Sequence, residues 1–215
     1  MEDPIGSHPT RAEQLDLLVA IVADMARAGD AVLDLGCGTG YLEHLLLAAR
    51  NDILPTGVDR NPDSLTTARA QFGDRAVFVE GDLLALDAIE LPRDKYRFAV
   101  TALTFHDLSD TDKQAVLAWT AARLESDGAI LIYDRVRLTE PALFPMQAAI
   151  WKRINRIHGR GMRTAATFMA YEEDLSETNR PAAPSDYQAW FDGLGFASQV
   201  LHLHGNVALI GAARR

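Results

Sequence analysis

One acidic residue and three alternating glycines stand in one short stretch of the chain, and their types suit the binding of a nucleoside-like ligand. The stretch runs from Asp34 through Gly36, Cys37 and Gly38 to Gly40. Glycine at such positions lets the backbone turn sharply and lets a ligand approach it without an intervening Cβ. The helix predicted after the loop would place its N-terminus beside that ligand.

A second acidic residue stands at the end of the next apolar run. Asp59 closes the run 54–59, and its carboxylate could accept both hydroxyls of a ribose. A glycine loop followed by an acidic residue after the next strand is the arrangement of dinucleotide-type sites. We therefore assign Asp59, together with the adjoining Arg60, to the same ligand site. The alternative is that Asp59 caps the helix that follows.

The elements that must position these residues alternate along the chain. Apolar runs predict strands at 31–35, 54–59, 76–80, 98–103 and 129–133, and helical patterns lie between them at 41–50, 62–72 and 110–124, after a first helix at 10–28. Strands separated by helices form right-handed crossovers and a parallel sheet. Two last runs, 196–204 and 207–213, are joined by Gly205 and Asn206, a connection so short that it predicts an antiparallel hairpin.

The predicted fold is therefore α/β: a Rossmann-like, doubly wound, seven-stranded sheet with a parallel body and an antiparallel C-terminal hairpin. We expect one domain over residues 1–215, with an N-terminal helical cap at 1–29. Residues 135–185 fit neither pattern and predict a helical insertion after the fifth strand. We expect this insertion to cover the carboxyl edge of the sheet as a lid, where ligands bind in open α/β folds. The alternative is a helical excursion that touches no ligand.

The glycine loop has the form Gly-x-Gly-x-Gly and resembles that of the class I S-adenosylmethionine-dependent methyltransferases, in particular the small-molecule type. The resemblance covers residues 31–134 by motif and the terminal hairpin by topology. It implies S-adenosylmethionine as cofactor, with the glycine loop around its methionine end and Asp59 at its ribose. It also implies Asp82 on the adenine side with Leu83 beside the ring, and the backbone of Thr101 near the methionine amine. Asp82 as a simple turn residue is the alternative.

His106 is the candidate catalytic residue because it follows the fourth strand at the carboxyl edge, where substrate should meet cofactor. Methyl transfer from a sulfonium is an in-line displacement that mainly demands positioning. A base is needed only when the attacking atom carries a proton of high pKa, and an imidazole suits that role near neutral pH. The alternative is that His106 caps the next helix or packs beneath the insertion.

The insertion supplies the candidate substrate residues. Its basic stretch contains Lys152, Arg153, Arg156, His158, Arg160 and Arg163, with no acidic residue between Glu140 and Glu172. Arg153 and Arg160 could bind an acidic substrate bidentately, although a solvated helix face is the alternative. Trp151 and Tyr171 could wall an apolar pocket or form the insertion's own small core, and both interpretations stay open.

Composition limits the partners. The chain has 215 residues, 48% of them hydrophobic, and a net charge of −9 from 21 basic and 30 acidic residues. An acidic protein is poorly suited to coat nucleic acid, whose phosphates attract basic surfaces. Cys37 is the single cysteine and excludes an intrachain disulfide, which favours a reducing compartment. No signal peptide and no run of about 20 apolar residues is present, so we expect a soluble, cytoplasmic protein without a membrane partner.

The sequence thus predicts methyl transfer from S-adenosylmethionine to an oxygen or nitrogen atom of a small, acidic molecule. A non-catalytic partner or sensor domain that binds the same cofactor is the first alternative. A nicotinamide oxidoreductase is the second, but the chain lacks a Tyr-Lys pair at a useful spacing. No metal site is expected, because His202 and His204 have no acidic or cysteine cluster nearby. A homodimer stays open.

Overall fold

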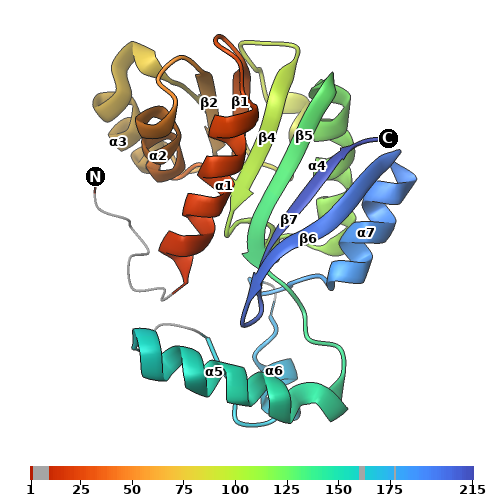
Figure 1. Cartoon of the computed structure of the whole chain (residues 1–215). Coiled ribbons are helices and arrows are strands. Elements are labelled where there is room, and N and C mark those ends of the chain that lie inside the picture. Colours follow the sequence, from red (N-terminus) through yellow and green to blue (C-terminus); the bar gives the residue numbers. More distant parts are fainter. Residues whose placement is uncertain (2–9, 160–162, 177) are drawn as a thin grey trace.

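A seven-stranded sheet forms the centre of the computed structural model, which describes residues 1, 10–159, 163–176 and 178–215 (Figure 1). Its strand order is β3-β2-β1-β4-β5-β7-β6. The strands are β1 (Ala31–Leu35), β2 (Leu54–Asp59), β3 (Val77–Glu80), β4 (Tyr96–Ala102), β5 (Leu124–Arg135), β6 (Phe196–His204) and β7 (Val207–Arg214). The first five pair in parallel, whereas β7 runs antiparallel to both β5 and β6. The predicted fold class is confirmed.

Helices cover both faces of the sheet and bury a separate core against each (Figure 1). One face carries α1 (Arg11–Met25), α2 (Tyr41–Ala49) and α3 (Pro62–Phe72), and the other carries α4 (Asp110–Arg123) and α7 (Pro184–Gly193). Successive residues of a strand point to opposite faces, so Val32 belongs to the first core and Leu33 to the second. Every residue of β1 is buried as a result, including Asp34.

The element boundaries differ from the prediction mainly around β5 and α7. β5 begins at Leu124, before the predicted 129, because Leu124 already pairs with Tyr96 of β4. The register of this pairing shifts between Tyr96 and Phe98, so Phe98 pairs with Ala129. Helix α7 was not predicted, and its first turn overlaps the end of the expected insertion.

The insertion between β5 and α7, residues 136–183, lies beyond the carboxyl ends of the parallel strands (Figure 1). It contains α5 (Phe144–His158) and α6 (Phe168–Glu173). Phe144, Trp151 and Tyr171 form a small core of their own. Trp151 also connects this core to the sheet, because its Nε1 donates to Oδ1 of Asn206 in the β6–β7 turn at 3.2 Å.

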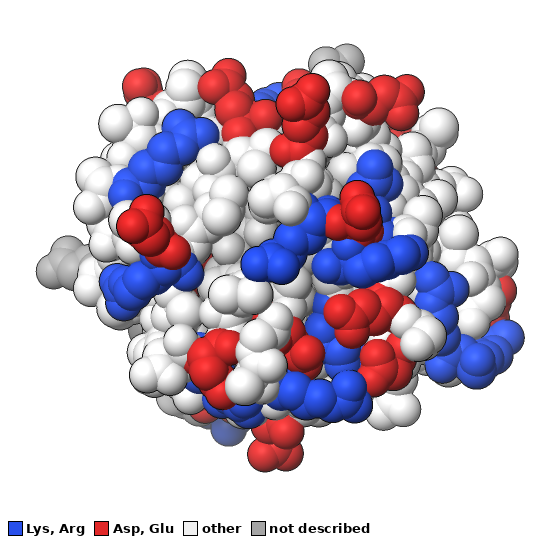
Figure 2. Space-filling model, turned by 90° about the horizontal axis from the view of Figure 1, so that it is seen from above, with Lys and Arg blue, Asp and Glu red and all other residues white. Residues whose placement is uncertain are grey.

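The opposite edge of the molecule, at the amino ends of the parallel strands, shows a different surface. Figure 2 views this face and shows basic and acidic side chains interspersed over it. At this edge Arg27 pairs with Asp127 of β5 at 3.1 Å, and Arg50 pairs with Asp52 at 2.8 Å. Within the described ranges, no helix is both long enough and apolar enough to cross a membrane.

Candidate functional site

A cleft of about 480 Å³ opens at the carboxyl ends of the strands, within the size range of small-molecule sites. Its walls come from α1, the glycine loop after β1, the ends of β2 and β4, the loop after β3, and the end of the insertion. The lining residues are Arg11, Asp34, Gly36, Cys37, Gly38, Thr39, Tyr41, Leu42, Val58, Asp59, Arg60, Gly81, Asp82, Leu83, Leu84, Ala102, Leu103, Thr104, Asp107, Leu108, Thr178 and Arg180.

The glycine loop owes its shape to backbone conformations that side chains rarely adopt. Gly36, Gly38 and Gly40 have φ angles of +80°, +55° and +82°, in the left-handed region that favours glycine. A Cβ on Gly36 would lie 2.2 Å from Oγ1 of Thr104, so the protein's own packing requires glycine there. A Cβ on Gly38 would meet nothing within 4 Å. Because Gly38 lines the cleft, the space beside it is open to a ligand.

Asp59 joins the end of β2 to the glycine loop. Its Oδ2 accepts a hydrogen bond from the Gly38 amide at 2.8 Å, and its Oδ1 accepts one from the Asn61 amide at 2.8 Å. Asp59 does not cap α3, because the Asn61 side chain accepts from the amides of Asp63 and Ser64 and fills that position. Asp59 therefore faces the cleft, as does Arg60 beside it.

The loop after β3 brings Asp82 and Leu83 to the cleft wall. Oδ1 of Asp82 accepts from the Leu84 amide at 2.9 Å, so Asp82 stabilises a turn and lines the cleft at the same time. Thr101 and Gly40 lie behind the wall instead. Oγ1 of Thr101 donates to the carbonyl of Leu35 at 2.8 Å, which joins β4 to β1.

Asp34 and Cys37 face the cleft from a buried position. Asp34 is only 3% exposed, and burial, reinforced by the charge of Asp59, raises the pKa of its carboxyl to about 7, against the opposing effect of Arg11. Burial also raises the pKa of the Cys37 thiol far above its ordinary value, with help from the nearby carboxyls. Cys37 is therefore a neutral thiol that packs in the loop, since the thiolate is the nucleophilic form.

His106 pairs with an aspartate that sequence reasoning missed. Its Nδ1 lies 2.6 Å from Oδ1 of Asp134, and its backbone amide donates to Oδ2 of the same residue at 2.8 Å. Both side chains are buried. Nε2 of His106 lies 3.4 Å from Oδ1 of Asp107, which lines the cleft. Asp134 ends the buried run of β5 at the same carboxyl edge, and an acidic residue at that place is the signal that could have revealed it.

His106 does not cap α4, because Ser109 occupies that position. The end of the insertion contacts His106 directly, since the Arg180 amide donates to the His106 carbonyl at 2.5 Å. Arg180 also donates from its guanidinium to the carbonyl of Asp107 at 3.0 Å. The insertion thus contributes Thr178 and Arg180 to the cleft, and neither residue was predicted from the sequence.

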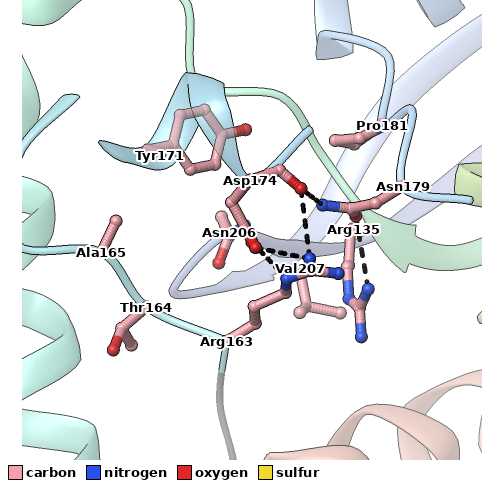
Figure 3. A pocket seen from close by; sticks show the side chains of 10 residues that line it. All are labelled: Arg135, Arg163, Thr164, Ala165, Tyr171, Asp174, Asn179, Pro181, Asn206 and Val207. Atoms are coloured by element: carbon pink, nitrogen blue, oxygen red, sulfur yellow. Dashed lines mark hydrogen bonds and ion pairs between the residues drawn. The ribbon is translucent and has the colours of Figure 1, made fainter. Parts of the chain in front are cut away.

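Three of the four predicted substrate residues lie away from this cleft. Trp151 and Tyr171 pack in the insertion's own core, and Arg153 lies exposed on α5. Arg160 is outside the described residues. Tyr171 lines a second, much smaller cavity of about 20 Å³, drawn in Figure 3 with Arg135, Arg163 and Asn206. That volume holds about one water molecule, so the cleft of about 480 Å³ is the candidate site.

Metal ligands do not gather in the described part of the chain: it contains no group of three or more His, Cys, Asp or Glu side chains suited to hold an ion. His202 and His204 approach Glu13 of α1 instead, at 4.0 Å and 3.4 Å.

Comparison with known proteins finds methyltransferases. Residues 32–128 match the family described as methyltransferase domain. A protein of Bacillus pumilus described as an uncharacterized methyltransferase is 28% identical over 216 residues, which span 100% of this chain and 92% of that protein. Ribosomal RNA small subunit methyltransferase A of Anaeromyxobacter is 31% identical over 140 residues, 63% of this chain and 46% of that protein. The chain thus spans less than half of that second relative.

A solved structure shows the same fold. The magnesium protoporphyrin IX methyltransferase of Synechocystis, determined with bound S-adenosylhomocysteine, superposes with a TM-score of 0.64 at 16% identity over 100% of this chain and 89% of that one. The glycine loop, the sheet order and these matches agree: residues 32–128 match the methyltransferase domain family, and the chain has the fold of the class I S-adenosylmethionine-dependent methyltransferases.

Proposed function

We propose that the protein transfers a methyl group from S-adenosylmethionine to an oxygen or nitrogen atom of a small molecule, with His106 as the general base. The observation that carries the proposal is the 2.6 Å contact between His106 and Asp134. His106 is buried and does not itself line the cleft, but the next residue, Asp107, does. A buried carboxylate on one imidazole nitrogen is the arrangement that orients a histidine for proton transfer.

The cleft fits the cofactor on three observations. Oδ1 of Asp34 is buried and has no hydrogen-bond donor among the described residues, which suits a positively charged ligand group. The space beside Gly38 is open, and the cleft has the volume of a small-molecule site. The bound cofactor supplies a methyl group activated by a positively charged sulfur.

Each wall of the cleft has a role in this arrangement. The glycine loop, with Asp34, would hold the methionine end of the cofactor, and Asp59 and Arg60 would contact its ribose. Asp82 and Leu83 would bind the adenine, because they line the same wall one strand further along. Leu103 and Thr104, rather than Thr101, would meet the cofactor from β4.

His106 would remove the proton from the acceptor. In the tautomer whose Nδ1 donates to Asp134, Nε2 carries no proton and can accept one. Nε2 is also the nitrogen nearer to Asp107 at the cleft wall. Such a base typically contributes 10²–10⁴-fold to the rate.

The surroundings support a small, acidic acceptor. Arg180 lines the cleft next to His106, and its guanidinium could pair with a carboxylate or phosphate bidentately. It takes the place that the sequence suggested for Arg153. The net charge of −9 favours a small acceptor over a nucleic acid, which needs a basic surface. The Synechocystis enzyme is named as a methyltransferase of magnesium protoporphyrin IX, which is a small molecule.

Transfer of labelled methyl groups tests the proposal. The protein is incubated with methyl-labelled S-adenosylmethionine and either hydroxylated aromatic acids, small amines or a ribosomal RNA transcript. We expect label in a small-molecule product. Label found in the RNA alone would overturn the choice of acceptor. If the protein binds the cofactor normally but transfers label to none of these substrates, the sensor alternative would be favoured.

Variants then test the base. His106→Gln and Asp134→Asn should each lower kcat by about 10²–10⁴-fold while the affinity for S-adenosylhomocysteine stays within about twofold. His202→Gln on β6, outside the cleft, is the matched control and should keep full activity. Unchanged turnover of both site variants across pH would refute the role of His106.

A further inference from the structure

Two buried carboxyl groups meet at the inner wall of the cleft. Glu43, on the first turn of α2, is completely buried, and Asp34, in β1, is 3% exposed. The side chains are within hydrogen-bonding contact of each other. Asp34 lines the cleft, whereas Glu43 lies behind it, so that a Cβ on Gly57 would fall 2.6 Å from Oε1 of Glu43.

The contact between these groups requires a proton. Neither oxygen of Glu43, nor Oδ1 of Asp34, receives a hydrogen bond from any donor in the described part of the chain. Two ionised carboxylates only accept hydrogen bonds and repel each other, and a buried charge without a partner is costly. One of the two must therefore carry a proton and donate it to the other.

The environment of each group decides which one keeps the proton. Burial raises the pKa of Glu43 well above its ordinary value, and its hydrogen bond to Asp34 raises it further. The same bond lowers the pKa of Asp34, as does the charge of Arg11. The other ionisable groups facing the pair are Asp59 on β2 and Cys37 in the glycine loop. Arg11 and the cleft both lie on the side of Asp34, so the negative charge belongs there.

We propose that Glu43 is a positioning residue for the cofactor: it stays protonated at neutral pH and donates its hydrogen bond to Asp34, so that Asp34 meets the positively charged ammonium of the cofactor's methionine end as a carboxylate. The inference rests on the proposed placement of the cofactor beside Asp34. It also gives cofactor binding a pH dependence. Below about pH 7 Asp34 gains a proton, and the ligand's ammonium can then pair with Asp34 only when that proton leaves, so the affinity falls by up to tenfold per pH unit.

Calorimetry with S-adenosylhomocysteine, in buffers of different ionisation enthalpy between pH 5.5 and 8.5, measures both affinity and proton release. Glu43→Gln keeps a neutral donor of the same shape, and we expect its Kd within about twofold of wild type at every pH. Glu43→Met removes the donor. We expect its Kd at pH 7 to be weaker by about tenfold, because a hydrogen bond to a carboxylate is lost, and its pH profile to move upward by about one unit. The amine of S-adenosylhomocysteine also titrates, but it does so equally for wild type and both variants, so it does not affect the differences between them.

The pattern across the two variants decides the proposal. Weakening by Glu43→Gln as large as that by Glu43→Met would show that the charge of Glu43, not its proton, is needed, and would overturn the proposal. Identical pH profiles for all three proteins would overturn it as well. A merely structural role would alter the stability of Glu43→Met without moving its pH profile.

Infrared spectroscopy of the cofactor-free protein tests the proton directly and does not need Glu43→Met to fold. At pH 8 wild type should show a buried, protonated carboxyl band that Glu43→Gln lacks. Absence of that difference would overturn the proposal. If the band is present but both Glu43 variants bind the cofactor as tightly as wild type at every pH, the result would instead count against the placement of the cofactor beside Asp34. Neither readout depends on which acceptor is methylated.

Discussion

The carboxylate of Asp59 accepts a hydrogen bond from the backbone amide of Gly38 at 2.8 Å, and this contact holds the glycine loop against the end of β2. The residue proposed to bind the ribose therefore also fixes the loop proposed to hold the methionine end. The two halves of the cofactor site are mechanically coupled through one side chain.

Asp59→Asn should weaken binding of S-adenosylhomocysteine by about 10–100-fold. An asparagine oxygen can accept from only one side, so its NH₂ group would face either the Gly38 or the Asn61 amide, both of which now donate to Asp59. The expected size follows from about 1.5–3 kcal/mol for a hydrogen bond to a charged group. Calorimetry measures the affinity. Asp63→Asn, on the exposed first turn of α3, is the control and should bind normally.

Gly38→Ala should lower cofactor affinity, whereas Gly29→Ala should not. Both glycines have positive φ angles, +55° and +85°, and a Cβ on either would meet nothing within 4 Å. Each substitution should therefore cost a similar, roughly 1–2 kcal/mol of folding stability for the left-handed backbone. Only the alanine at position 38 projects beside the cleft. Equal affinities for the two variants, measured beside their urea unfolding curves, would contradict the placement of the ligand at Gly38.

The raised pKa of Asp34 should lower the free energy of unfolding as the pH rises from about 4 to about 7. Its pKa is about 7 in the folded state, against an ordinary value of 3.8 for the unfolded chain. Between these values the unfolded chain has released the proton that the folded protein still holds, so a rise in pH favours unfolding, by at most about 1.4 kcal/mol per pH unit. Asp34→Asn cannot titrate, and its urea unfolding free energy should fall less over this range. Parallel curves for variant and wild type would show that the Asp34 pKa is not raised.

Trp151→Phe should loosen the insertion from the sheet. The substitution removes the hydrogen bond from Nε1 to Asn206 and leaves the buried Asn206 oxygen without that donor, at a cost of about 1 kcal/mol. We expect faster hydrogen exchange in residues 136–183. Trp119→Phe on α4 is the matched control, because within the described residues the Nε1 of Trp119 has no hydrogen-bond partner. Equal exchange in the two variants would indicate that the Asn206 bond does not hold the insertion.

The sequence by itself determined the fold class, the strand sequence and the glycine loop. These features are local: apolar runs predict buried strands, a short Gly205-Asn206 link permits only a hairpin, and positive φ angles at Gly36, Gly38 and Gly40 demand glycine. The acidic residue after β2 was also identifiable, because its position relative to the loop is set by one βαβ unit.

Only the tertiary structure decided which distant side chains meet. His106 and Asp134 are 28 residues apart, and they pair because β4 and β5 are neighbours that end at the same edge. Glu43 meets Asp34 because α2 packs over β1, and Arg180 reaches the cleft because the insertion returns past His106. Trp151 and Tyr171 turned inward to bury their rings together. Such contacts depend on strand order and on the direction of each side chain, which are fixed by packing over the whole molecule rather than by local sequence.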